Sequence, residues 1–266
     1  MTKSAENLVV TRLEVREAGH VAYVTVNYPE RRNVLGIAGK KALTQTFNHL
    51  ARDKALRVAV LTGAGDRSFI AGADLAEMKG LTPKGAKEEH SWTHRACNSL
   101  RALPVPVIAR INGYYFGAGM ELAASCDVRI GITTAKFGMP EVRFGIPSGM
   151  EACLLPQLIG WGKTRELVYT GDPIDAAEAY RCGFLEKLVE PSALDFGVEQ
   201  WVSSMLAAGP RAIRLQKKLV RDWERMTIAQ AVRAGINACV EARRTDEPKR
   251  LMTAFLERKK TVSGKR

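Results

Sequence analysis

The strongest constraint on the fold is a change of pattern along the chain. Up to about residue 190, short apolar segments rich in β-branched residues alternate with longer segments of helical periodicity. Glycines and prolines separate them, and after this point only helical patterns remain. Alternating strands and helices are typical of an α/β protein. The sequence therefore predicts an α/β core over residues 1–195 and a helical region over residues 196–266.

The alternation also locates the individual elements. Strands are expected at residues 20–28, 56–62, 104–112, 127–132 and 185–189. Helices are expected at residues 38–52, 75–78, 91–103, 118–125, 150–159, 192–208, 210–224, 227–242 and 247–260. Leu43, Phe47 and Leu50 share one face of the first helix, as expected for a helix packed on a core. Residues 80–90 are polar and contain a proline and a glycine, which predicts a mobile loop.

Composition limits the class of protein. With 266 residues, of which 46% are hydrophobic and 26% charged, the chain can bury a full core without disulfides or a metal. Its five cysteines are odd in number and widely spaced, so they predict neither a disulfide framework nor a zinc site. No stretch is long and apolar enough for a membrane span, and the N-terminus lacks a secretory signal pattern. We therefore expect a cytoplasmic protein that does not insert into membranes.

The net charge of +12 is concentrated at the C-terminal end. Residues 201–266 hold 16 Lys and Arg against 6 Asp and Glu, a net charge of +10. This excess is interpreted first as a solvated helical face, second as a site for a ligand phosphate, and third as a nucleic-acid surface. The third interpretation is disfavoured, because the basic residues are spread over several helices with few aromatic residues between them.

Two loops carry the pattern expected of an anion site. Residues 70–74 (IAGAD) and 113–121 (GYYFGAGME) each follow a predicted strand and lead into a predicted helix. Small residues let a ligand approach the backbone, and unpaired N–H groups at a helix start favour an anionic oxygen. Two such groups that converge on one oxygen would form an oxyanion hole. The alternative is that the glycines only serve tight turns. The second loop matches neither a dinucleotide fingerprint nor a P-loop, which argues against a nucleoside triphosphate or a nicotinamide cofactor.

Two carboxylates favour the functional interpretation of these loops. Glu121 lies in the first turn of the helix that follows the second loop, and Glu141 lies 20 residues later in an irregular segment. The residues after Glu121 (LAASC) are too apolar for an exposed helix, so we expect this glutamate to be partly buried. Burial raises the pKa of a carboxyl, and two carboxyls facing one substrate separate into an acid and a base. The alternative is a surface glutamate favoured by the helix dipole.

These stretches together resemble a known family. The segments SFIAGADL (68–75), NGYYFGAGMELAASCDVRI (112–130) and KFGMPEVRFGIP (136–147) closely resemble the enoyl-CoA hydratase/isomerase (crotonase) superfamily, most of all its enoyl-CoA hydratases. The likeness extends to YPERRNVL (28–35) and to residues 158–189, in order and with matching spacing over about residues 10–260.

The resemblance implies a fold and a reaction. The fold would be a spiral of ββα units with a helical C-terminal region that forms a homotrimer or a dimer of trimers. The reaction would be hydration of a 2-enoyl-CoA thioester to a 3-hydroxyacyl-CoA, as in fatty acid metabolism. Coenzyme A is then part of the acyl-CoA substrate, and neither a separate cofactor nor a metal is implied.

The resemblance also assigns residues to the reaction. The backbone N–H groups of Ala73 and Ala118 would form the oxyanion hole for the enolate. Glu121 would orient and deprotonate the water that attacks C3, and Glu141 would deliver a proton to C2. The substrate would also contact Arg31, Val34, Ala71, Gly72, Asp74, Gly117 and Gly149. Arg31 and Arg32 lie in the loop that approaches the adenine end of coenzyme A in the family, and Lys259 and Lys260 match a region that reaches a neighbouring subunit's ligand.

The sequence departs from the family pattern in one segment. Many family hydratases read Gly-Ala-Gly-Gly-Thr-Gln after the Ile-Pro that follows the second glutamate, whereas this chain reads SGMEA at residues 148–152. Either Glu151 enters the site, or Ser148 and Glu151 form a capping box for the next helix, which is the favoured interpretation. The departure keeps isomerisation, hydrolysis and decarboxylation of an acyl-CoA open as alternative reactions on this scaffold.

Four further side chains have two interpretations each. His90 and His94 have the i, i+4 spacing of metal ligands, but no third ligand lies near in sequence, which favours a solvated or loop-closing pair. Met78 and Trp92 either line an acyl pocket or belong to the core.

Overall fold

A computed structural model describes the backbone of residues 8–263 and the side chains of residues 8–257. The chain falls into two compact units that divide after Val202. The predicted division after residue 195 falls in the first turn of helix α7 (Leu194–Ala207). The side chains of Lys259 and Lys260 lie outside the described residues, so the role assigned to them stays a prediction.

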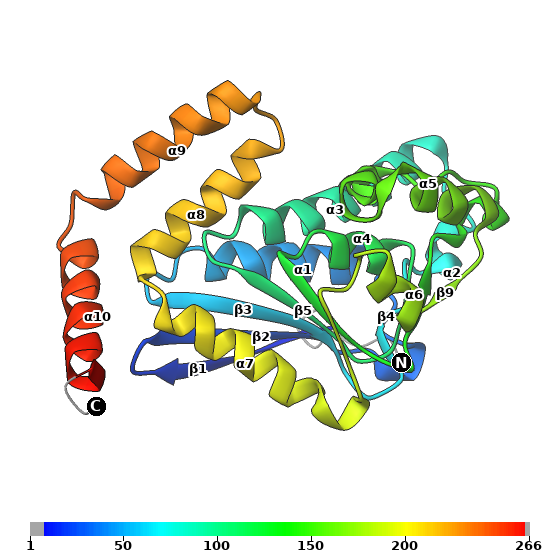
Figure 1. The fold of residues 1–266 in the computed structure, drawn as a ribbon. Helices are drawn as coiled ribbons and strands as arrows, with labels where there is room; N and C mark the ends of the chain where they lie inside the picture. The colour runs from blue at the N-terminus through cyan, green and yellow to red at the C-terminus, as the bar shows by residue number, and fades with distance from the viewer. Residues whose placement is uncertain (1–7, 264–266) are drawn as a thin grey trace. The chain divides into compact units, whose positions relative to one another are not determined.

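The larger unit is built on two sheets, and Figure 1 labels β1, β2, β3 and β5 of the first and β4 and β9 of the second. The first sheet has six strands in the order β1 (Val9–Arg16), β2 (Gly19–Val26), β3 (Leu56–Gly63), β5 (Val107–Ile111), β7 (Val128–Ile132) and β10 (Lys187–Val189). The second has four short strands in the order β4 (Ser68–Ile70), β6 (Tyr114–Phe116), β8 (Lys136–Gly138) and β9 (Ile174–Asp175). All pairs are parallel except β1 with β2 and β8 with β9.

The two sheets grow together along the chain. Three times a strand of the large sheet is followed by a strand of the small one and then by a helical segment. The successive groups are β3, β4 and helices α2 (Leu75–Met78) and α3 (Pro83–Ala102); β5, β6 and α4 (Ala118–Ala124); and β7, β8 and the 3-10 helix η3 (Pro140–Phe144). This repetition is the predicted spiral of ββα units, and it brings the segments after β4, β6 and β8 to the same edge of the small sheet.

The strands and the first helix could be predicted because their residues are buried in the core. Nearly every residue of β3 is buried, because a parallel strand inside such a fold is covered on both faces. Helix α1 (Ile37–Leu50) packs on α3, and its predicted apolar face of Leu43, Phe47 and Leu50 is buried. Also in the core, the rings of Tyr115, Phe137 and Phe184 stack on one another with centroids 4.8 to 6.0 Å apart.

Residues 80–90 correct one prediction. They do not form a mobile loop but the beginning of α3, which starts at Pro83. The Thr82 hydroxyl accepts a hydrogen bond from the N–H of Gly85 at 3.2 Å, and proline suits the first helical position. The polar residues read as a loop, such as Lys84 and Lys87, form the exposed side of this helix.

The segment after Ile146 corrects a second prediction. The expected helix at residues 150–159 is instead a 3-10 helix, η4 (Met150–Leu154), followed by α5 (Leu155–Thr170). A left-handed Gly160, with φ 74°, interrupts α5 near its middle. The helical turn begins after Gly149 without a side-chain cap, so the predicted capping box is absent. Shorter elements complete this unit: η2 (Pro29–Arg31), α6 (Ala176–Arg181) and η5 (Pro191–Ala193).

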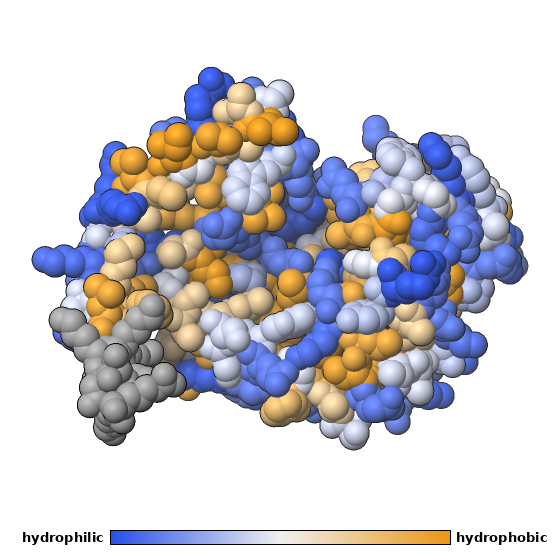
Figure 2. All heavy atoms as spheres, viewed as in Figure 1, coloured by the Kyte–Doolittle hydropathy of each residue, from blue (hydrophilic) through white to orange (hydrophobic). Residues whose placement is uncertain are grey.

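The smaller unit is helical, as predicted. It contains α8 (Pro210–Trp223), α9 (Ile228–Ala242) and α10 (Glu247–Ser263), and α8 packs on α9. The Glu247 carboxylate accepts hydrogen bonds from the first N–H groups of α8, those of Arg211 and Ala212, at 3.1 and 3.0 Å. Apolar side chains line one side of α9, as the space-filling view shows (Figure 2). Within the described part of the chain, no helix is both long and apolar enough to cross a membrane.

Candidate active site

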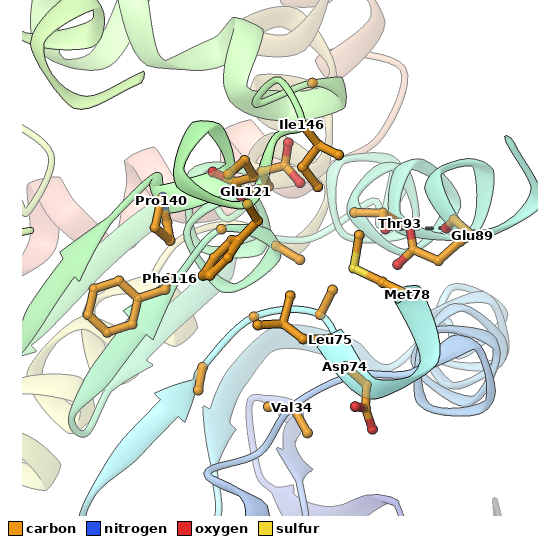
Figure 3. A pocket seen from close by; sticks show the side chains of 18 of the residues that line it. Val34, Asp74, Leu75, Met78, Glu89, Thr93, Phe116, Glu121, Pro140 and Ile146 are labelled. Atoms are coloured by element: carbon orange, nitrogen blue, oxygen red, sulfur yellow. Dashed lines mark hydrogen bonds between the residues drawn. The ribbon is translucent and has the colours of Figure 1, made fainter. Parts of the chain in front are cut away.

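A cavity of about 560 Å³ opens in the larger unit, at the edge where the segments after β4, β6 and β8 meet (Figure 3). The residues that the sequence predicted for the site all line it: Arg31, Val34, Ala71, Gly72, Ala73, Asp74, Gly117, Ala118, Glu121, Glu141 and Gly149. The fold therefore gathers residues that are up to 118 positions apart in the sequence around one space.

The two glycine-containing loops pack directly against each other. Gly72 has a φ of +114°, and a β-carbon at this position would lie 3.0 Å from the carbonyl oxygen of Phe116 in the second loop. Gly117, the next residue of that loop, has φ 51° and ψ −118°, a conformation that only glycine adopts readily. The backbone conformations that glycine permits thus bring the segments that hold Ala73 and Ala118 together.

The N–H groups of Ala73 and Ala118 are placed to bind a ligand oxygen. Ala118 is the first residue of α4, and Ala73 lies directly before Asp74, the N-cap of α2. Their neighbours are paired: the N–H of Gly117 donates to Gly138 at 3.0 Å and that of Asp74 to Leu35 at 3.3 Å. Among the described residues, no acceptor pairs with the N–H of Ala73 or Ala118. Two donors without partners at the wall of one cavity are what an oxyanion hole requires.

Glu121 is buried at the start of α4. Only 2% of its surface is exposed, and its Oε1 accepts a hydrogen bond from the N–H of Ala152 at 3.2 Å. Helix α4 lies this close to β4 because Gly119 has no β-carbon; a β-carbon there would overlap the carbonyl oxygen of Ile70. Burial first, and then the nearby Glu141 carboxyl, raise the pKa of Glu121 to about 8. The two neighbouring carboxyls therefore hold one proton between them at neutral pH.

Glu141 reaches the same cavity from η3. A β-carbon on Gly117 would overlap its Oε1, so this carboxyl lies against the second loop. The hydroxyl of Ser148 donates a hydrogen bond to its Oε2 at 2.7 Å. Burial raises the pKa of Glu141, whereas the Ser148 hydrogen bond favours the ionised form. The sequence did not predict this contact between Ser148 and Glu141. The departure from the family pattern at residues 148–152 could have indicated it, because it introduces a hydroxyl seven residues after Glu141.

Glu151 neither caps a helix nor lines the cavity, so the favoured capping-box interpretation was wrong. It is buried, and its Oε1 lies 2.6 Å from the Nδ1 of His94. Glu151 lies on η4, and its charge contributes to the raised pKa of Glu121. The other histidine of the candidate metal pair, His90, faces a different carboxylate, with its Nδ1 2.8 Å from Oε2 of Glu89. The two histidines thus lie beside separate acidic partners.

Asp74 organises the mouth of the cavity. Its two oxygens bind Arg31 through two hydrogen bonds of 2.7 and 2.9 Å, and Oδ1 also caps α2 at the N–H of Ala76. Asp74 is buried, whereas the Arg31 side chain is half exposed.

Met78 lines the cavity, but Trp92 does not. The ring of Trp92 lies beneath the cationic groups of Lys41 and Arg95.

Comparisons with known proteins agree with this site. A sequence profile of the enoyl-CoA hydratase/isomerase family matches residues 16–265. The short-chain-enoyl-CoA hydratase of Clostridium acetobutylicum is 34% identical over 247 residues, which cover 92% of this chain and 95% of that protein. The crotonyl-CoA hydratase of Syntrophomonas wolfei is 35% identical over 256 residues, 96% of both chains.

A solved structure extends the likeness to three dimensions. The enoyl-CoA hydratase of Bacillus anthracis has a TM-score of 0.88 with this chain at 30% identity, and the match covers 93% of this chain and 96% of that one. The resemblance found in the sequence motifs is therefore confirmed over the chain as a whole. With its ββα spiral and its matching profile, the chain belongs to the enoyl-CoA hydratase/isomerase family.

Proposed function

We propose that this protein adds water to a 2-enoyl-CoA thioester and forms a 3-hydroxyacyl-CoA. The observation that carries the proposal is the pairing of Glu121 and Glu141 in one cavity with the unpaired N–H groups of Ala73 and Ala118. A thioester enolate needs donors at its oxygen, and hydration needs an acid and a base. The hydratases of Clostridium and Syntrophomonas, which match nearly the whole chain, support the same reaction.

The reaction can be followed atom by atom. The thioester oxygen accepts hydrogen bonds from Ala73 and Ala118, which polarise the conjugated double bond. Water attacks C3, the double-bond electrons move onto the thioester oxygen as an enolate, and Glu121 accepts the proton of the water. The enolate then collapses and C2 takes a proton from Glu141. After one turnover Glu121 holds the proton, and a transfer from Glu121 to Glu141 restores the starting state.

The reaction is tested most directly with crotonyl-CoA. Hydration removes the conjugation of the thioester, so its ultraviolet absorbance is expected to fall on addition of the protein, and the product gains the mass of one water. An unchanged mass with a shifted double bond would indicate isomerisation instead. Release of coenzyme A would indicate hydrolysis, and loss of carbon dioxide from a carboxylated acyl-CoA would indicate decarboxylation.

A bell-shaped pH dependence is expected for kcat/KM. Turnover requires one proton on the pair of carboxyls, and the pair loses this proton as the pH rises through the Glu121 pKa of about 8. Above that pH, kcat/KM should fall about tenfold for each pH unit, and in acid it should fall again as the second carboxyl is protonated. Initial rates between pH 5 and 10 would measure this. A profile that stays level through pH 8 and 9 would contradict the shared proton.

The nucleotide end of coenzyme A is assigned to the mouth of the cavity. Arg31, beside Val34 and Ala71, offers a half-exposed guanidinium for a ligand phosphate. Its bidentate pair with Asp74 holds that guanidinium in place.

We assign the activity to the cytoplasm, because the five cysteines are all thiols, which suits a reducing compartment.

We propose that the protein is a homotrimer or a dimer of trimers that associates through the helical unit. Ile228, Val232, Ile236 and Val240 recur every four residues along α9, and each is more than half exposed (Figure 2). An exposed apolar row of this kind is typical of a surface that another chain covers. Light scattering should give a mass of about three or six times 29.2 kDa, whereas the mass of one chain would contradict the proposal.

A further inference from the structure

One wall of the cavity is polar where an acyl chain would be expected to meet apolar groups. Glu89, His90 and Thr93 line it from a single face of α3. Met78 and Ile146, by contrast, are apolar, and Figure 3 shows both side chains around the same cavity as Glu89. A pocket for an unsubstituted alkyl chain is lined mostly by apolar groups. The residues of α3 therefore need a separate explanation.

Glu89 is a buried carboxylate with a buried counter-ion. Its side chain is 3% exposed and that of Lys40, on α1, is 1% exposed, and the Lys40 ammonium group contacts Oε1 of Glu89. Removing two charges from water is costly, and a buried ion pair is often no more stable than apolar side chains of similar volume. Core stability therefore gives no reason to keep this pair, and its place in the cavity wall indicates a role toward the ligand.

The second oxygen of Glu89 still has accepting capacity. Within the described part of the chain, Oε2 has no hydrogen-bond partner. The nearest ring nitrogen, Nδ1 of His90, lies 2.8 Å away but outside hydrogen-bond geometry. A carboxylate offers about four lone-pair positions, and Lys40 occupies one oxygen only. A ligand with an N–H or O–H group at this wall would supply the missing donor.

The Lys40–Glu89 pair belongs to the acyl end of the cavity rather than to its mouth. Glu89 lines the same cavity as the reacting carboxyls Glu121 and Glu141, and the charge of Lys40 offsets a small part of the rise in the pKa of Glu121. Arg31, which marks the mouth, is bound by Asp74, the N-cap of α2, whereas Glu89 lies on α3. Glu89 is thus positioned to meet a group attached to the acyl chain near the double bond or beyond it.

We propose that the acyl group of the substrate carries a hydrogen-bond donor, such as a hydroxyl, which Glu89 accepts through Oε2. The proposal rests on the proposed hydration of an enoyl-CoA and adds the class of acyl chain. Plain alkyl chains leave the carboxylate without a partner, and chains that end in a carboxylate meet a like charge. Both are therefore expected to be poorer substrates than hydroxylated chains of the same length.

The experiment compares acyl chains that differ only at their last carbon. 2-Enoyl-CoA thioesters with four, six and eight carbons are supplied with a methyl or a hydroxymethyl end, and the six-carbon chain also with a carboxylate end. At the length that reaches Glu89, kcat/KM should be about tenfold or more higher for the hydroxylated chain than for the methyl chain. A preference for the methyl chain at every length, or for the carboxylate chain, would overturn the proposal.

Variants separate Glu89 from general effects of the fold. Lys40→Met combined with Glu89→Leu replaces the pair by apolar side chains and should reverse the preference in favour of the methyl chain. The matched control combines Lys41→Met with Glu88→Leu, which removes the exposed neighbouring pair on the same two helices and should keep the wild-type preference. An unchanged preference in the first variant would overturn the role of Glu89.

Binding without turnover makes the test independent of hydration. Calorimetry with the saturated thioesters hexanoyl-CoA and 6-hydroxyhexanoyl-CoA, or their four- and eight-carbon counterparts, measures recognition of the acyl end alone. If no enoyl-CoA is hydrated, the proposed function fails, but tighter binding of a hydroxylated chain by the wild-type protein would still support the polar subsite. Equal affinities at every length would overturn it, whatever the reaction.

Discussion

Replacing Glu141 by Gln is expected to lower kcat for crotonyl-CoA hydration by about 100- to 10,000-fold, the usual contribution of a positioned acid or base. The amide keeps the size of the side chain and can still accept the hydrogen bond from Ser148, but it has no acidic proton for C2. Absorbance assays at saturating substrate would measure kcat, and thermal unfolding would show that the variant is folded. A folded variant with wild-type turnover would remove Glu141 from the mechanism.

Ser148→Ala is the matched control for this variant. It leaves the Glu141 carboxyl intact and removes only the hydrogen bond that favours its ionised form. The effect on kcat should therefore be much smaller than that of Glu141→Gln, and the acid limb of the pH profile should move to higher pH. A loss as large as that of Glu141→Gln would indicate that Ser148 itself takes part in the chemistry.

Ala118→Pro is expected to reduce kcat by about 100- to 1000-fold, the usual cost of losing one oxyanion donor. Proline has no N–H, and its ring would occupy the space in front of that group. The first position of a helix tolerates proline, and Ala118 is the first residue of α4. Gly117, which precedes it, has no β-carbon to clash with the ring. The substitution thus removes the donor and keeps the helix.

The comparison with Ala118→Gly completes this test, because glycine keeps the N–H group and changes only the side chain. It should retain kcat within a few-fold, and helix content by circular dichroism should be the same in both variants. If folded Ala118→Pro turned over crotonyl-CoA at the wild-type rate, the thioester oxygen would have to be bound elsewhere in the cavity.

The elements that could be predicted are those whose burial leaves a pattern. Strand β3 is apolar along almost its whole length, and the apolar face of α1 repeats at helical spacing. The strands β4, β6 and β8 have only three residues each, too few for any period to be recognised. The start of α3 was missed for a different reason, since its first turns are exposed and polar and resemble a loop in composition.

The candidate site divides in the same way. Glu121 and Glu141 could be proposed because each lies beside a recognisable motif. The contact between Lys40 and Glu89 spans 49 residues and joins two helices, so no local pattern contains it. The hydrogen bond from Ser148 to Glu141 spans only seven residues, but the spacing of Ser148 and Glu151 also fits a capping box. The backbone of residues 145–154, with a left-handed Gly145 and the 3-10 helix η4, places Ser148 beside Glu141 and leaves η4 without a side-chain cap. This conformation, and not the spacing in the sequence, distinguishes the hydrogen bond from the capping box.

The site draws its groups from two kinds of structure, and this has a consequence for how the family can diversify. The proposed oxyanion donors are main-chain groups just before α2 and at the start of α4, and no single side-chain replacement, proline apart, removes them. The two carboxyls come from side chains on α4 and η3, and the hydroxyl that binds Glu141 comes from Ser148, in the segment before η4. In the proposed mechanism, activation of the thioester therefore depends on the backbone, whereas the fate of the enolate depends on a few exchangeable side chains.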